Sequence, residues 1–185
     1  KAEQGLKAPG IHRTYLAIVE GKVMPVSGVM DAPIARKEDR CLRRVVDFKR
    51  GDRAVTHYRV LTGWQTGNAQ KFRSLVKLQL ETGRTHQIRV HMAYLGHPLV
   101  GDFLYNPAYG ENQIDRRDDE NSGERHFSRG KTFSCGKEQY DIGRQALHAW
   151  KLSFFHPMTG KPMEFTAPLP PDMQRLIPEE TLPSV

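Results

Sequence analysis

The chain has 185 residues, enough for one domain with a hydrophobic core. Its 28 Lys and Arg residues against 21 Asp and Glu give a net charge of +7, which fits a polyanionic partner such as nucleic acid without requiring one. No apolar run approaches the roughly 20 residues that span a bilayer, so we expect no membrane association. The cysteines, Cys41 and Cys135, form no C-x-x-C pair; a disulfide framework is not indicated, and we expect a cytoplasmic protein.

Several segments alternate polar and apolar residues, which is typical of strands with one buried face. The predicted strands cover residues 13–21, 53–61, 72–82, 146–155 and 161–168. The second and third should be antiparallel partners across the turn-rich GWQTGNAQ connection, and the last two should form a hairpin around HPMTG. Antiparallel pairing therefore dominates the predicted sheet.

Two helices are predicted. The first covers 86–95, with Thr85 as N-cap and Gly96 as the residue that ends it. Its residues Ile88, Met92 and Leu95 lie on one face, which should pack on the sheet. The second is a short helix that begins at the Pro170-Pro171 pair. The fold class is therefore α+β, a mixed, mainly antiparallel sheet with flanking helices.

Residues 106–143 differ from the rest of the chain. They contain few large aliphatic residues and many charged ones, as in ENQIDRRDDENSGER. Such a composition cannot bury enough apolar surface to form a core of its own. We predict a charged, partly mobile insertion within a single domain that covers 1–185.

The charged residues around the first helix leave several functions open. Arg89 lies at the edge of the apolar face, and a half-buried guanidinium needs a carboxylate, a phosphate or carbonyl groups as partner. Arg84 lies in the turn before the helix, where it could bind a phosphate or simply face solvent. Asp102 could be an acid or base, but a residue in this position more often caps a turn.

Other site classes are disfavoured by spacing. His86 and His91 lie five residues apart, about 140° around a helix, whereas a zinc pair prefers a separation of four. The sequence has no G-x-S-x-G nucleophile elbow, no phosphate loop and no G-x-G-x-x-G. We therefore expect neither a metal nor a nucleotide cofactor.

The stretch LETGRTHQIRVHMAYLGHPLVGDFLY (80–105) resembles the signature of RluA-type pseudouridine synthases, T-G-R-T/S-H-Q-I/L-R-V-H followed by G-H-P-I/L-x-G-D-x-x-Y. Three other stretches resemble further motifs of that family in the same order. RTYLAIVEG is similar to its K/R-x-Y-x-A-x-V-x-G strand, AVTHYRVL to its A-x-T-x-Y/F-x-V strand, and ALHAWKLSFFHPMTGKPMEFTAP to its closing hairpin. The resemblance covers residues 13–173 apart from the charged insertion.

The resemblance implies an enzyme that converts uridine in structured RNA, above all large-subunit ribosomal RNA, to pseudouridine without metal or organic cofactor. It implies that Tyr15 and Arg89 are catalytic, Arg89 through a salt bridge with the family's catalytic aspartate. Arg84 becomes the leading candidate for binding RNA phosphate, with Arg13, Lys71 and Lys77 as weaker ones. The remaining matched residues should line or support the substrate pocket: His86, Ile88, His91 and Leu147. We expect a monomer.

One departure from the family pattern affects the prediction. The H-R-L-D-x-x-T-S-G motif, which carries the family's catalytic aspartate, does not occur in these 185 residues. We therefore expect the chain to be the C-terminal part of a catalytic domain, inactive alone, with the partner of Arg89 outside it. The alternative is an RNA-binding or ribosome-assembly protein that has lost the motif and catalysis.

Overall fold

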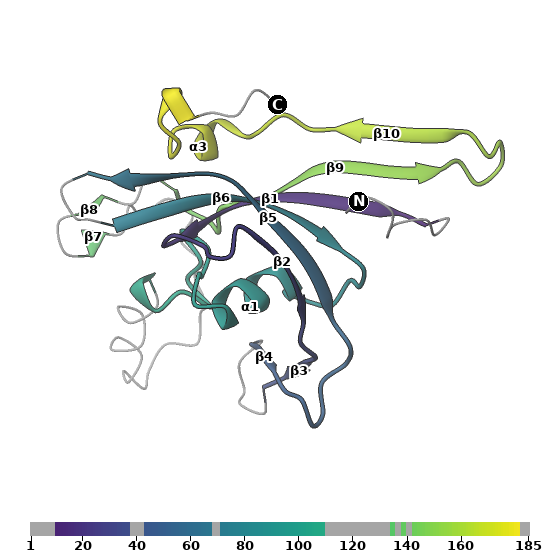
Figure 1. The fold of residues 1–185 in the computed structure, drawn as a ribbon, viewed down its shortest axis with the longest axis horizontal. Coiled ribbons are helices and arrows are strands. Elements are labelled where there is room, and N and C mark those ends of the chain that lie inside the picture. Colours follow the sequence, from purple (N-terminus) through teal and green to yellow (C-terminus); the bar gives the residue numbers. More distant parts are fainter. Residues whose placement is uncertain are drawn as a thin grey trace, which may run out of the picture.

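The computed structural model is built on one six-stranded sheet with the strand order β10-β9-β1-β6-β5-β2 (Figure 1). It describes residues 10–37, 43–67, 71–109, 134–135, 138–139 and 142–181. The strands of the sheet are β1 (His12–Glu20), β2 (Ser27–Asp31), β5 (Val55–Thr66), β6 (Lys71–Leu80), β9 (Leu147–Phe155) and β10 (Pro162–Thr166). All of the pairings within it are antiparallel. The α+β prediction is confirmed, and in the described part the sheet is antiparallel rather than mixed.

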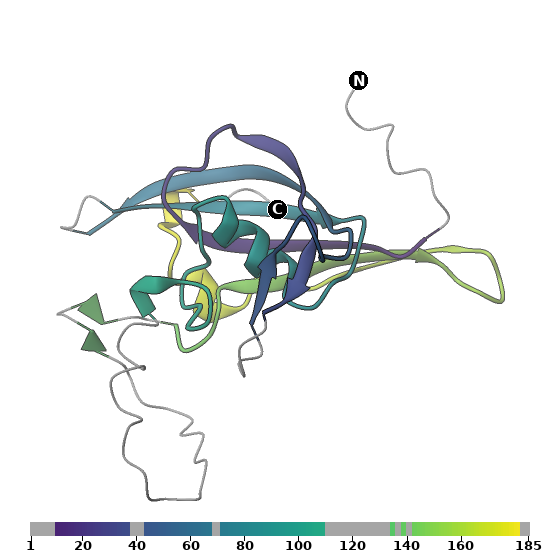
Figure 2. The same ribbon diagram turned by 90° about the horizontal axis from the view of Figure 1, so that it is seen from below.

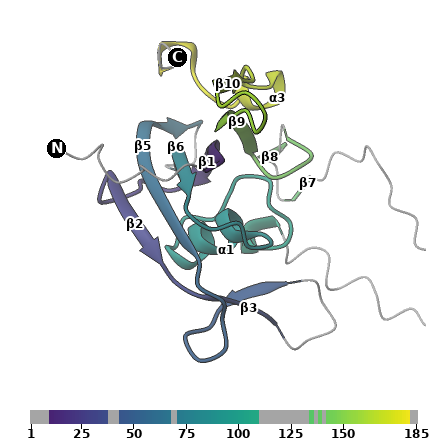
Figure 3. The same ribbon diagram turned by 90° about the vertical axis from the view of Figure 1, so that its right-hand side faces the viewer.

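Shorter elements complete the described part of the chain. They are the ribbon of β3 (Ile34–Arg36) and β4 (Arg44–Val46), the pair β7 (Ser134–Cys135) and β8 (Glu138–Gln139), the helices α1 (Gln87–Tyr94) and α3 (Pro171–Gln174), and the 3-10 helix η1 (Glu179–Thr181). Figures 1 and 3 place α1 and α3 on opposite sides of the sheet. Seen from the α1 side in Figure 2, the β3–β4 ribbon lies beside α1, and the β9–β10 hairpin extends beyond the other strands. Within the described residues, no helix has the length and apolar character to cross a membrane.

Alternation along β1 supplies both faces of the sheet. Ala17 and Val19 belong to the cluster on the α1 side, together with Ile88 and Met92 of the helix. Leu16 and Ile18 belong to the cluster on the other side, which includes residues of the C-terminal segment such as Met173. Because a strand in the middle of a sheet packs on both faces, β1 is buried over most of its length. The cluster on the α1 side packs α1 against β1, β5 and β6.

The five predicted strands and the two predicted helices are present, with the β5–β6 and β9–β10 pairings as expected. The predicted N-cap of the first helix, Thr85, is wrong. His86, with a left-handed φ of 57°, precedes α1 in place of Thr85 and forms no capping bond through its side chain. The end is as predicted, since Gly96 has a φ of +84° and only glycine adopts that backbone conformation at no cost.

The predicted insertion contains buried residues near both of its ends. The buried residues are Asn106 and Tyr109 at one end and Ile142 at the other. Tyr109 and Ile142 belong to the core cluster on the α3 side. Tyr109 and Ile142 are apolar residues next to a charged stretch, and the composition of the whole window concealed them. The charged residues 110–133, on which the prediction of mobility rests, lie outside the described residues.

Candidate functional site

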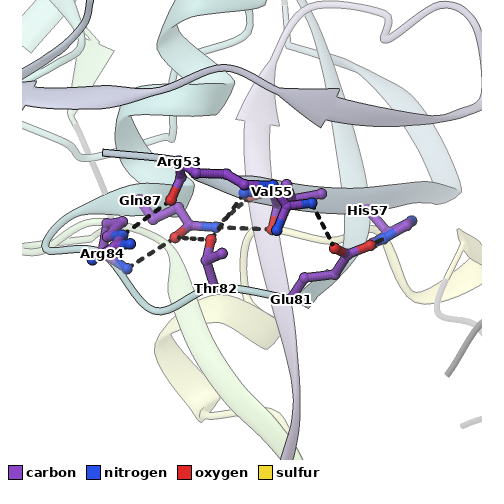
Figure 4. A network of polar contacts seen from close by, with 8 residues as sticks. Arg53, Val55, His57, Glu81, Thr82, Arg84 and Gln87 are labelled. Atoms are coloured by element: carbon purple, nitrogen blue, oxygen red, sulfur yellow. Dashed lines mark hydrogen bonds and ion pairs between the residues drawn. The ribbon is translucent and has the colours of Figure 1, made fainter. Parts of the chain in front are cut away.

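The turn between β6 and α1 is held by the side chain of Gln87 (Figure 4). Its Oε1 accepts hydrogen bonds from the Thr82 hydroxyl and the Arg84 backbone N–H, both at 2.9 Å. Its Nε2 donates to the Val55 carbonyl and to Thr56 Oγ1, both at 3.0 Å. Gln87 is buried, so each of these bonds satisfies a group that would otherwise be costly to leave without a partner. One amide therefore fixes the turn and the start of the helix against β5.

His91 continues this network into the core. Its Nε2 lies 2.8 Å from the Ala32 carbonyl, which can only accept, so we assign the proton to Nε2. Nδ1 then accepts from the Thr56 hydroxyl at 2.8 Å. Burial lowers the pKa of His91, which favours this neutral form. His91 is fully buried with both nitrogens occupied, so the geometry gives it a supporting role and not direct contact with substrate.

Arg89 forms a two-pronged salt bridge with Asp102. Arg89 Nε lies 2.8 Å from one carboxylate oxygen and Nη2 lies 2.7 Å from the other. The Asp102 side chain is completely buried and also accepts from the backbone N–H groups of Leu104 and Tyr105. The expectation that the partner of Arg89 lies outside the chain was therefore incomplete, because a buried carboxylate is already present. Asp102 is also the turn cap that the sequence suggested.

Tyr105 connects this ion pair to two other elements. The Arg89 guanidinium lies over its ring, 4.9 Å from the centroid. Its hydroxyl oxygen accepts from the Arg44 backbone N–H in β4 at 2.9 Å and lies 2.9 Å from His86 Nδ1. Burial lowers the pKa of His86, and the nearby Arg89 charge lowers it further. Burial also raises the pKa of Tyr105, so both groups are held neutral.

Tyr15 and Leu147 form the apolar part of the site. Both are partly buried and pack against the cluster that contains Ile88, on the α1 side of the sheet. In the adjacent strands Tyr15 is opposite Leu78 and Ala149. Among the described residues, no hydrogen bond or ring contact joins Tyr15 to Arg89. The structure therefore brings Tyr15, Ile88 and Leu147 together and groups Arg89 separately with His86, on the same side of the sheet.

Arginine side chains flank the turn that precedes α1. Arg84 is partly exposed, donates through Nε to the Arg53 carbonyl at 3.0 Å and has a 3.7 Å ion pair with Asp52. The guanidinium of Arg13 lies close to Gly83, since a Cβ at that glycine would be 3.5 Å from Arg13 Nη1. Arg53 pairs in turn with Glu81, whose pKa is lowered chiefly by a 2.6 Å hydrogen bond with His57. Arg84 and Arg13 thus present positive charge at one surface.

Lys77, a weaker phosphate candidate, is not part of this group. It is opposite Leu16 in the sheet, and its ammonium lies 5.8 Å from the centre of the Trp150 ring, against the other core cluster. In the described part of the chain, no three His, Cys, Asp or Glu side chains gather as metal ligands would.

The sequence pattern of the RNA pseudouridylate synthase family matches residues 1–94. The chain belongs to this family. The match covers the strand that carries Tyr15 and all of α1. Asp102, Tyr105 and Leu147 lie beyond the matched residues.

Relatives and solved structures agree with this family. The chain is 42% identical over 170 residues, 92% of its length and 47% of the relative, to the uncharacterized RNA pseudouridine synthase YjbO of Bacillus subtilis. It is 43% identical over 92% of its length, and 45% of the relative, to the ribosomal large subunit pseudouridine synthase D of Vibrio cholerae. The structure of human RNA pseudouridylate synthase domain containing 1 is similar with a TM-score of 0.60 and 26% identity, over 85% of this chain and 54% of that one. The chain spans about half the length of the curated relatives it matches.

Three residues of the site were not predicted from the sequence: Gln87, Asp102 as the partner of Arg89, and Tyr105. Each lies inside the family motif, in the T-H-Q and G-D-x-x-Y segments. A motif marks such positions without saying what they contact. The contacts of Asp102 and Tyr105 with the helix depend on how residues 96–105 fold back, which spacing along one helix does not reveal.

Proposed function

We propose that this pseudouridine synthase family member acts in the isomerisation of uridine to pseudouridine in structured RNA, with large-subunit ribosomal RNA as substrate. The observation that carries the proposal is the placement of Tyr15 and Arg89. Tyr15 is a partly buried tyrosine at the border of the apolar cluster on the α1 side. Arg89 follows Ile88, a member of that cluster, so α1 brings the cationic group to the same side of the sheet.

The reaction breaks the N1–C1′ bond of uridine, joins C5 to C1′, and moves the proton from C5 to N1. A target uridine inside folded RNA must first leave its stack to be reached. The Tyr15 ring offers an apolar surface for the extruded base, and its hydroxyl is suited to proton transfer at C5. These are the roles we propose for Tyr15.

Arg89 retains donors for a further partner despite its salt bridge. A guanidinium has five N–H groups, and the bonds to Asp102 use Nε and Nη2. Among the described residues, Nη1 has no hydrogen-bond partner. A second carboxylate or an RNA phosphate could therefore bind at Nη1 while Asp102 holds the guanidinium in place. The buried pair thus supports the proposed catalytic role of Arg89 as a preoriented cation.

The segment that includes the β3–β4 ribbon supports an RNA partner. Its described residues between 33 and 53 include the cations Arg36, Lys37, Arg43, Arg44, Lys49, Arg50 and Arg53, and the carboxylates Asp47 and Asp52. The Asp47 carboxylate is already used by the backbone N–H groups of its own turn. Phe48 is 67% exposed among these charges. Cations interspersed with an exposed aromatic ring suit a phosphate backbone with unstacked bases.

Carbodiimide labelling of an in vitro large-subunit ribosomal RNA transcript tests the proposal. The whole gene product that carries this chain should form pseudouridine, and Tyr15→Phe should abolish it. Tyr94→Phe is the matched control, because Tyr94 is 59% exposed at the end of α1, and it should retain activity. RNA binding without pseudouridine by a folded wild-type protein would refute isomerisation and favour the non-catalytic RNA-binding alternative. The monomeric state and cytoplasmic location stay predictions.

A further inference from the structure

The Tyr105 hydroxyl lies between the imidazole of His86 and the backbone of β4, next to the Arg89–Asp102 pair. We propose that Tyr105 is a positioning residue that fixes the tautomer of His86, so that the imidazole presents its Nε2–H as a neutral donor to the RNA substrate. The identity of that substrate rests on the proposed function. The role of Tyr105 itself rests on the hydrogen bonds below.

The direction of the hydrogen bonds follows from the single proton of a tyrosine hydroxyl. The Arg44 N–H can only donate, so it occupies an acceptor site on the Tyr105 oxygen at 2.9 Å. The hydroxyl proton is then free to point at His86 Nδ1, which lies 2.9 Å away. Nδ1 acts as acceptor, and the proton of the neutral imidazole must be on Nε2.

The surroundings keep His86 neutral. Burial and the positive charges of Arg89 and Arg44 lower its pKa, and only the Asp102 charge acts in the opposite direction. Arg89 engages that carboxylate through two bonds, which reduces its effect on the imidazole. A second proton on the ring would lie beside two cations, so the Nε2–H form is the one maintained at neutral pH.

The Tyr105 ring is held so that its hydroxyl cannot easily turn away. Its backbone N–H donates to Asp102, and the Arg89 guanidinium covers the ring. The His86 ring meets it edge-on, with centroids 5.6 Å apart and an interplanar angle of 81°. The left-handed backbone of His86 fixes the other end of the contact.

Nε2 of His86 has no hydrogen-bond partner in the described part of the chain. A neutral N–H suits a neutral carbonyl oxygen, whereas the phosphates are better matched by charged guanidinium groups such as Arg84. We therefore assign the His86 donor to a carbonyl oxygen of the bound uracil. Tyr105 acts on this contact only through His86.

Nitrogen-15 NMR of the imidazoles in the whole gene product tests the tautomer directly. The wild-type protein at pH 7 should show His86 with an unprotonated Nδ1 and a protonated Nε2. Tyr105→Phe keeps the ring under Arg89 but removes the hydroxyl, so His86 should become a mixture of tautomers. The Arg44 amide loses its acceptor and should exchange with deuterium about fivefold faster, as expected for the loss of one ordinary hydrogen bond. Tyr94→Phe should change neither signal.

Steady-state kinetics give a second readout. Tyr105→Phe should raise KM for RNA more than it lowers kcat. In a protein that already carries His86→Gln, Tyr105→Phe should change KM and kcat little further. The glutamine Nε2 is always a donor, so it does not depend on Tyr105 to fix a tautomer. An unchanged His86 spectrum in folded Tyr105→Phe, or additive effects of the two substitutions, would overturn the proposal. If the wild-type protein forms no pseudouridine, the proposed function fails, while the NMR and exchange results still decide the role of Tyr105.

Discussion

Loss of either partner of the buried Arg89–Asp102 salt bridge should strongly destabilise the protein. The side chain of Arg89 is 14% exposed and that of Asp102 is 0% exposed, so solvent screens neither charge effectively. Removing one partner leaves a buried charge without compensation, which costs about 3–5 kcal/mol. We expect Asp102→Asn near the lower end, because the amide oxygen can still accept from the N–H groups of Leu104 and Tyr105. Arg89→Met should fall near the upper end, since it leaves the buried carboxylate with only those two donors.

Urea unfolding at pH 7, followed by circular dichroism, measures both single variants and the double variant. The double variant removes both charges, so its loss should be smaller than the sum of the single losses by about 2–3 kcal/mol. Lys151–Glu164 is the matched control, because its bond is as short at 2.8 Å but the side chains are 33% and 58% exposed. Its coupling energy should stay below about 1 kcal/mol. A coupling energy at Arg89–Asp102 no larger than that of the control would refute the reasoning.

Gln87→Glu should lower the free energy of unfolding by about 2–4 kcal/mol, because a carboxylate would face the Val55 carbonyl. Urea unfolding measures this change, and an unchanged free energy of unfolding would contradict the hydrogen bonds assigned to Gln87. The pKa of His91, which faces Asp31, Thr56 and Ala32, is lowered by burial, so its contribution to stability should be complete above the ordinary value near 6.5 and decline as pH falls below it. An NMR titration that gives His91 a pKa above 6.5 would be inconsistent with this. Arg84→Ala and Arg13→Ala should each weaken RNA binding and reduce its salt dependence by about one phosphate contact. Arg175→Ala, next to α3, is the control and should change neither. Equal effects of all three substitutions would argue against an RNA-binding site at the turn before α1.

Most of the fold was predictable because local patterns coincide with tertiary packing. Residues 13–21 identify β1 although both of its faces are buried, since Thr14, Tyr15, Ile18 and Val19 are β-branched or aromatic residues that favour strands. The helix start was not predictable in the same way. Thr85 has the right chemistry for an N-cap, but the Gln87 amide binds the Arg84 N–H from inside the helix. Tertiary hydrogen bonds to β5 therefore decide where the helix begins.

The site was predicted as a set of positions and not as a set of roles. The motif identified both Arg89 and Asp102, yet spacing favoured a turn cap for Asp102 and left Arg89 without a partner in the chain. The structure shows that one carboxylate serves both purposes, because residues 96–105 fold back onto α1. The same return of the chain brings Tyr105 to His86. Neither contact follows from the period of any single element.

The hydrogen bonds within the motif separate residues that support the site from residues that can bind substrate. Within the motif, Gln87, His91 and Asp102 are buried and their polar atoms are used by the protein itself. Among the described residues, His86 Nε2 and Arg89 Nη1 have no hydrogen-bond partner, and the Arg84 side chain is partly exposed in the turn before α1. His86 and Arg89 both contact Tyr105, so a substitution there should change the two together. Under the proposed function, we therefore expect RNA to bind at the turn before α1 and at the start of this helix, while Gln87, His91 and Asp102 hold these segments in place.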